Sequence, residues 1–70
     1  MQPALWHPTK PYSQNEPCTA NGGYIYASKI PGGDSNAENP PALLGDENWL
    51  FFYDIAAWMT YVANMKADAV

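Results

Sequence analysis

The residues that could do chemistry are few in this chain of 70 amino acids, which has one histidine and one cysteine. Nucleophilic catalysis needs a base beside the nucleophile, and a structural zinc site needs paired Cys and His ligands. His7 and Cys18 have no such neighbours in a recognisable motif, so we expect a solvated loop histidine and a small buried thiol. Asp34, Asp46 and Glu47 lack the spacing of a calcium-binding loop. The sequence therefore predicts no catalytic residue, no metal site and no cofactor, and we do not expect an enzyme.

The charge of the chain argues against one class of partner, nucleic acid. Three basic residues stand against seven acidic ones, for a net charge of −4, and arginine is missing. Because binding to nucleic acid depends on clustered Lys and Arg side chains, the scattered Lys10, Lys29 and Lys66 argue against a nucleic-acid partner. The N-terminus lacks the pattern of a secretory signal, and a lone thiol suits synthesis in a reducing cytoplasm.

Apolar residues are concentrated in the last third of the chain. Residues 49–65 read WLFFYDIAAWMTYVANM, whereas the first 48 residues hold all seven prolines and all five glycines. A single core in a chain this short supplies only about 3–5 kcal/mol, and small domains usually add a disulfide, a metal or a partner. Since the first two are not expected, we predict that other protein chains, including copies of itself, stabilise the molecule.

The N-terminal part of the chain is rich in residues that break helices and favour turns. Residues 1–15 are rich in proline, which predicts an extended arm anchored by its aromatic side chains, Trp6 and Tyr12. Asn21-Gly22 is the strongest short hairpin signal, because both central residues of a type I′ turn need positive φ.

Around this turn the pattern predicts a small β module over residues 16–53. We expect strands at about 16–20 and 24–29, a long polar loop over 30–48, and a third strand over 48–53. A loop of that length in a compact domain is usually functional or held by a partner.

The C-terminal segment, residues 54–70, is predicted to be helical. Asp54 is a good N-cap for a helix that begins at Ile55. Tyr53 precedes the cap and can pack on Trp58 as a hydrophobic staple. The fold class is therefore α+β: a three-stranded antiparallel module with a Pro-rich N-terminal arm and one C-terminal amphipathic helix.

This helix is predicted to dock onto protein through one apolar face. The partner-binding residues that we expect are Phe51, Ile55, Trp58, Met59, Val62 and Met65. The opposite face is predicted to hold Ala57, Thr60, Tyr61, Asn64 and Asp68.

Residues 6–52 resemble the small chitin-binding, type-three carbohydrate-binding modules. Those modules carry a Trp, then Tyr-x-x-Gly-Asp-x-Val, an Asn-Gly hairpin, a Tyr-x-Ala strand, a Pro-Gly loop and a closing Trp. The matching positions here are Trp6, Tyr12, Asn15-Glu16, Cys18, Asn21-Gly22, Tyr26-Ala27, Pro31-Gly32 and Trp49. Similar modules recur in bacteriophage tail fibres and other virion proteins, so the resemblance implies an attachment or assembly role.

The chain departs from that pattern in its functional part. Asn15-Glu16 stands in place of Gly-Asp, Cys18 in place of Val, and Ile25 in the slot of the strand tyrosine. The family's exposed sugar-stacking aromatics follow this strand, whereas residues 28–32 here contain none.

Three functions follow as hypotheses. The first is a structural interaction protein of a bacteriophage virion, assembled in the host cytoplasm as a tail, fibre-attachment or decoration subunit. The second is a carbohydrate-binding module that holds a surface glycan on Trp6, Tyr24 and Tyr26. The third is a single-helix subunit of a membrane complex, because residues 49–65 reach the lower limit of a membrane span. We do not expect the chain to bind a membrane in this way, because the carboxylate of Asp54 interrupts residues 49–65.

Overall fold

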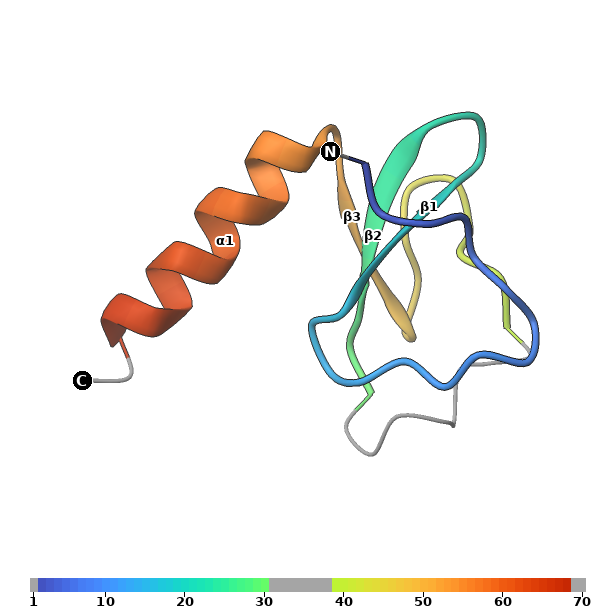
Figure 1. Ribbon diagram of the computed structural model, residues 1–70, viewed down its shortest axis with the longest axis horizontal. Helices are drawn as coiled ribbons and strands as arrows, with labels where there is room; N and C mark the ends of the chain where they lie inside the picture. The colour runs from blue at the N-terminus through green and yellow to red at the C-terminus, as the bar shows by residue number, and fades with distance from the viewer. Residues whose placement is uncertain (1, 31–38, 69–70) are drawn as a thin grey trace.

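The fold is a three-stranded antiparallel sheet followed by one C-terminal helix, as predicted, and the helix packs on the sheet. A computed structural model describes residues 2–30 and 39–68. The strands are β1 (Pro17–Ala20), β2 (Tyr24–Ser28) and β3 (Trp49–Phe52), in the order β1-β2-β3, and α1 covers Ile55–Asp68. In Figure 1 α1 leaves the end of β3 and runs away from the sheet on the side opposite the 39–48 segment.

The hairpin between β1 and β2 confirms the turn signal. Asn21 and Gly22 both have positive φ, at 55° and 89°. Ala20 pairs with Tyr24, so Gly23 completes a three-residue loop, and its amide donates to the Ala20 carbonyl at 3.2 Å. Each observed strand lies within one residue of its predicted ends.

The N-terminal arm covers the outer edge of β1. Leu5 and Thr19 form a parallel bridge, with the Thr19 amide donating to the Ala4 carbonyl at 2.9 Å. The Trp6 amide donates to the Thr19 carbonyl at 2.9 Å, and the Thr19 hydroxyl donates to the Pro3 carbonyl at 2.7 Å. Because an open strand edge invites pairing with other chains, these bonds remove one such edge.

One face of the sheet carries the main core. Its four side chains are each exposed by 1% or less: Tyr12, Cys18, Tyr26 and Trp49. Tyr12 meets Trp49 edge to face at 5.1 Å between ring centroids, and the indole N–H of Trp49 donates to the Asn39 carbonyl at 2.7 Å. The aromatic residues of the arm and of β3 thus form a core across a long stretch of sequence.

The other face of the sheet is where α1 packs. The buried residues of this second cluster are Ile25, Ala27 and Phe52. Three side chains of α1, spaced one turn apart, pack against it: Ile55, Trp58 and Tyr61. The helix begins as predicted, because the Asp54 carboxylate accepts the Ala57 amide at 2.9 Å.

Three sequence-based placements differ from the structure. Tyr61, predicted on the face opposite Trp58, packs on Phe52 with 5.2 Å between ring centroids. Phe51 packs against the main core, because alternate residues of β3 point to opposite faces. Tyr53 shares that side, with its ring 6.0 Å from that of Tyr24, so the predicted staple between Tyr53 and Trp58 is wrong.

Part of the predicted 30–48 loop is an ordered turn. The Asp46 carboxylate accepts three backbone amides, from Ala42, Asn48 and Trp49, at 2.8–3.1 Å. Gly45 has φ of 84°, and a Cβ there would lie 2.8 Å from the Trp49 carbonyl oxygen, so this turn needs glycine. Residues 31–38, including the Pro31-Gly32 of the family pattern, lie outside the described residues.

Candidate interaction surface

Asn15 determines how α1 sits on the sheet. Its φ is 70°, a conformation that asparagine tolerates better than most residues, and its amide donates to the Ser28 carbonyl at 2.7 Å. Its backbone carbonyl accepts the indole N–H of Trp58 at 3.2 Å, and its side-chain oxygen accepts the hydroxyl of Tyr61, also at 3.2 Å. Two turns of α1 are therefore fixed by one residue that is more than 40 positions away in the sequence.

Beside Trp58, which itself packs on the sheet, α1 carries an open apolar hollow of about 320 Å³. We call this the α1 hollow, and its lining residues are Trp58, Met59, Val62 and Ala63. Their spacing of one, four and five positions places them on one side of a helix. Residues 55–65 contain no charged side chain, which is unusual for a helix surface in water.

The six predicted partner-binding residues are divided among three environments. Ile55 and Trp58 pack on the sheet of the same chain, and Phe51 lies on its other face. Met59, Val62 and Met65 remain on α1 away from the second cluster, with Met59 exposed by 59% and Met65 by 38%. Ala63 also lines the hollow and was missed, although it lies four residues after Met59.

The three residues predicted to hold a glycan are not equivalent. Tyr26 is fully buried; its hydroxyl donates to the Leu43 carbonyl at 2.6 Å and accepts from the Asn21 amide group at 2.9 Å. Its ring therefore offers no face to a sugar, and that assignment is corrected. Trp6 packs half-buried on the main core, and Tyr24 is also half-buried.

A row of aromatic rings does reach the surface beside Tyr24. The ring centroid of Tyr24 lies 5.4 Å from that of Phe51 and 6.0 Å from that of Tyr53. Tyr53 is exposed by 74%. Sequence spacing alone did not suggest this group, because Tyr24 and Tyr53 belong to different elements.

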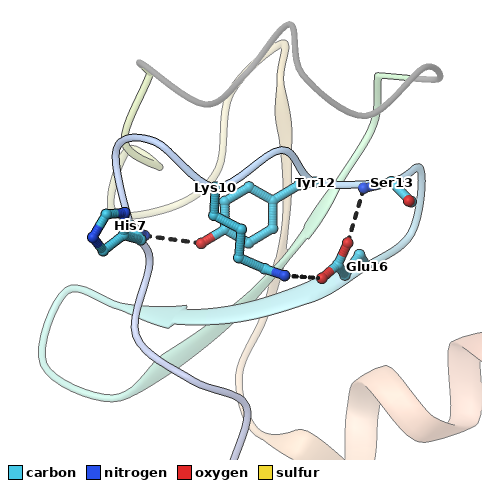
Figure 2. A network of polar contacts seen from close by, with 5 residues as sticks. All are labelled: His7, Lys10, Tyr12, Ser13 and Glu16. Atoms are coloured by element: carbon cyan, nitrogen blue, oxygen red, sulfur yellow. Dashed lines mark hydrogen bonds and ion pairs between the residues drawn. The ribbon is translucent and has the colours of Figure 1, made fainter.

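The turn before β1 is held by the polar network of Figure 2, in which Glu16 is central. Its carboxylate accepts the Ser13 amide at 2.9 Å and pairs with the Lys10 ammonium at 2.8 Å. Partial burial raises the pKa of Glu16, but the bonds from Lys10 and Ser13 outweigh it and hold that pKa below its usual value. The bond to Glu16 raises the pKa of Lys10 in turn. Nearby, the backbone amide of His7 donates to the buried Tyr12 hydroxyl at 2.9 Å.

His7 and Cys18 are the two side chains near this turn whose types could be reactive. The exposed His7 ring accepts the Thr9 amide at 3.1 Å on Nδ1, which orients the ring locally. Cys18 is buried as predicted, and burial, with a smaller contribution from Glu16, raises the pKa of its thiol to about 12. A thiol with that pKa is a poor nucleophile near neutral pH. Among residues 2–30 and 39–68 no group of three potential ligand side chains could hold a metal ion.

Comparison with known proteins gives no relative. No family model, no curated protein and no solved structure matches the chain. In the described part of the chain, no helix combines the length and apolar character needed to cross a bilayer.

Proposed function

We propose that this chain is a small structural interaction protein, held in a larger assembly by the free flank of α1. The observation that carries the proposal is the α1 hollow, which has apolar walls on a stretch of helix, residues 55–65, without charged side chains and is open to solvent. An apolar hollow of this kind can receive a protruding apolar side chain of another protein. A bacteriophage virion, with this chain as a tail, fibre-attachment or decoration subunit, is the assembly that we propose.

Two further features support an assembly role. The exposed Met59 side chain, which lines the hollow, is flexible and polarizable, and this suits a contact surface that adapts to its partner. The network around Asn15 fixes α1 on the sheet, so this surface is presented in a defined orientation. Preorganisation of this kind lowers the entropic cost of docking.

Co-sedimentation in cells that produce the protein tests this proposal. The chain should sediment with a particle far larger than itself, and Met59→Glu should release it because a carboxylate would be buried in an apolar contact. Asn64→Glu is the matched control, since Asn64 is exposed and lies outside the hollow. Sedimentation as a free small protein, or equal loss with both variants, would contradict the proposal.

A second candidate function, glycan binding, is favoured by the aromatic row of Tyr24, Phe51 and Tyr53. Exposed tyrosine rings can stack on the apolar face of a sugar, and Tyr53 is the most accessible of the three. At Asn15, where the family pattern has glycine, φ is positive, a conformation that glycine adopts readily.

Affinity electrophoresis through gels that contain soluble chitin derivatives tests the second candidate. We expect the polysaccharide to retard the native chain and Leu5→Ala, but not Tyr53→Ala. Leu5 is the control, because it is an equally exposed apolar residue on the arm. Migration that does not change with the polysaccharide would remove this function.

A further inference from the structure

The tip of the β1–β2 hairpin places an asparagine directly before a glycine. Asn21 and Gly22 are both exposed, with φ of 55° and 89°. Asparagine is a thermolabile residue, because the backbone nitrogen of the next residue can attack the carbon of its side-chain amide. A glycine in that next position leaves the attack unhindered, since it has no side chain. The chemistry of this pair is therefore spontaneous deamidation.

The nucleophile of that reaction, the amide nitrogen of Gly22, makes no hydrogen bond. No group among the described residues accepts from the Gly22 N–H, whereas the Gly23 amide donates to the Ala20 carbonyl at 3.2 Å. A Cβ on Gly22 would meet nothing within 4 Å, so the hairpin is open on this side. The nitrogen can therefore react without breaking a bond of its own.

Asn15 shows what a protected asparagine looks like in the same chain. It also has positive φ, at 70°, but the amide that follows it belongs to Glu16 and donates to the Ser13 carbonyl at 3.0 Å. The side chain of Glu16 also crowds this nitrogen, as no side chain does at Gly22. A left-handed backbone is common to both sites, and the free amide is found only at the hairpin.

The remaining described asparagines also lack a free amide after them. The amide that follows Asn48 donates to the Asp46 carboxylate at 3.0 Å. Asn39 precedes a proline, whose nitrogen has no proton to lose. Asn64 lies inside α1, where backbone amides bond along the helix. In the part of the chain that the structure describes, Asn21 is thus the asparagine most open to this attack.

The side-chain amide of Asn21 ties the hairpin to the 39–48 segment. Its nitrogen donates to the Tyr26 hydroxyl at 2.9 Å and to the Pro41 carbonyl at 3.0 Å. The Tyr26 hydroxyl donates its own proton to the Leu43 carbonyl at 2.6 Å, so it acts as an acceptor towards Asn21. Pro41 is buried, and no second donor to its carbonyl lies among residues 2–30 and 39–68. Both bonds therefore need N–H groups on residue 21.

We propose that Asn21 is a site of self-modification, where attack by the Gly22 nitrogen removes the side-chain amide and releases the hairpin from the 39–48 segment. The bond between the Gly22 nitrogen and Asn21 Cγ forms as the Cγ–Nδ2 bond breaks, and Nδ2 leaves as ammonia with the proton of the Gly22 amide. Water then opens the five-membered imide at either carbonyl, which gives aspartate or isoaspartate. This inference goes beyond the proposed function and does not depend on it.

Either product breaks the tie permanently. Aspartate and isoaspartate have no side-chain N–H, and each adds a negative charge near neutral pH. A buried carbonyl without its donor is unfavourable, and a carboxylate beside it adds repulsion between the two oxygens. The Pro41 carbonyl should therefore move away from the hairpin and take the turn at residues 42–45 with it.

The same two bonds set the pace of the reaction. The nitrogen that donates them is the one that leaves, so both bonds must open before ammonia departs. Two net hydrogen bonds of about 1 kcal/mol each reduce the open population about thirtyfold. We therefore expect deamidation in the folded chain to be about thirty times slower at Asn21 than in the unfolded chain.

Ageing of the purified full chain tests the site. The chain is incubated in mildly alkaline buffer, folded or in guanidinium chloride, and peptide mapping by mass spectrometry locates each replacement of NH2 by OH. We expect Asn21 to convert before any other asparagine of the folded chain, and an isoaspartate-specific methyltransferase to label the product. Earlier conversion at another asparagine, or a folded chain that stays intact after the unfolded chain has converted many times over, would overturn the assignment. Equal rates in both states would show that the two bonds do not pace the reaction.

Hydrogen exchange tests the release. The Gly45 amide donates to the Ala42 carbonyl at 2.9 Å, within the turn that Asn21 ties down. Its exchange should be about fivefold faster or more in the aged product and in Asn21→Asp, the factor that corresponds to one lost hydrogen bond. Asn64→Asp is the matched control, because it adds the same charge at an exposed position of α1.

This control should exchange like the native chain, and the amides of α1 should keep their native rates in every sample. Unchanged exchange at Gly45 in the aged product would mean that the tie survives deamidation, and the release would be refuted. Equal acceleration in α1 would also count against it, because that pattern reports unfolding of the whole domain rather than of one turn.

Discussion

Replacing Trp58 by alanine tests whether a single side chain holds α1 on the sheet. Trp58 packs half-buried against the second cluster, and its indole N–H donates to the Asn15 carbonyl at 3.2 Å. Truncation of a fully buried Trp costs about 3–5 kcal/mol, and a net hydrogen bond contributes about 1 kcal/mol. Because this ring is only half-buried, we expect a loss of about 2–4 kcal/mol in the free energy of unfolding.

That loss is comparable to the whole stability expected of a domain this small, about 3–5 kcal/mol. The variant should therefore be largely unfolded, or keep its sheet with α1 detached. Urea denaturation followed by far-ultraviolet circular dichroism measures the free energy, and in the variant the fluorescence of the two remaining tryptophans, Trp6 and Trp49, reports separately on the main core. Trp58→Phe should recover most of the stability, because it keeps an aromatic ring and loses mainly the hydrogen bond.

Ala57→Ser is the control, since Ala57 is exposed and a serine in a helix costs only about 0.5 kcal/mol. A loss below about 1 kcal/mol for Trp58→Ala, or an equal loss for Ala57→Ser, would refute the packing of α1 described above. Trp58→Ala should also fail to join any assembly, but through loss of the fold. Met59→Glu should fail with the fold intact, and circular dichroism separates the two cases.

Three other perturbations follow from the structure. Gly45→Ala should lower stability by about 2 kcal/mol or more in a urea titration, because a left-handed φ costs a residue with a Cβ about 1–2 kcal/mol and the Trp49 carbonyl leaves no room; unchanged stability would show that the turn relaxes. Asn21→Asp should cost about 1–3 kcal/mol at pH 7, because a carboxylate cannot donate to the Pro41 carbonyl, and the loss should shrink below about pH 4 as the new acid is protonated. The Cys18 thiol should resist alkylation at pH 8 until urea is added, because it is buried in the folded state. Burial raises its pKa to about 12, so the free energy of unfolding should fall as pH rises from about 8.5 towards that value. In Cys18→Val the free energy of unfolding should fall less steeply over the same pH range.

The sequence alone predicted the features that depend on residues close together in the chain. Asn21-Gly22 produced the hairpin because positive φ at both positions is a local property, and Asp54 began α1 because its carboxylate needs only the amide of Ala57. The strands followed from alternation and from the breakers between them, and the buried thiol of Cys18 from the lack of any reactive partner in the sequence. The fold class follows from these short-range preferences taken together.

The turn within residues 39–48 was not predicted from the sequence. Composition predicted a long polar loop, yet backbone hydrogen bonds hold this part of it in a turn, with Leu43 and Leu44 exposed. The Asp46 carboxylate organises it by accepting three amides, and one of its partners, Trp49, belongs to a strand. A hydrogen-bond network of this kind has no signature in hydropathy.

The tertiary structure alone decided which surface of α1 is free. The prediction sorted the helix by polarity and put Tyr61 opposite Trp58, although three positions along a helix bring two side chains to within about 60° of each other. In the structure both side chains face the sheet, because Asn15 offers two oxygen acceptors at the point where the arm meets β2. Trp58 and Tyr61 each donate one hydrogen bond to these oxygens while their rings stay against the core. That rotation of the helix leaves Met59 and Ala63 in solvent, and it depends on contacts over more than 40 residues that no local pattern contains.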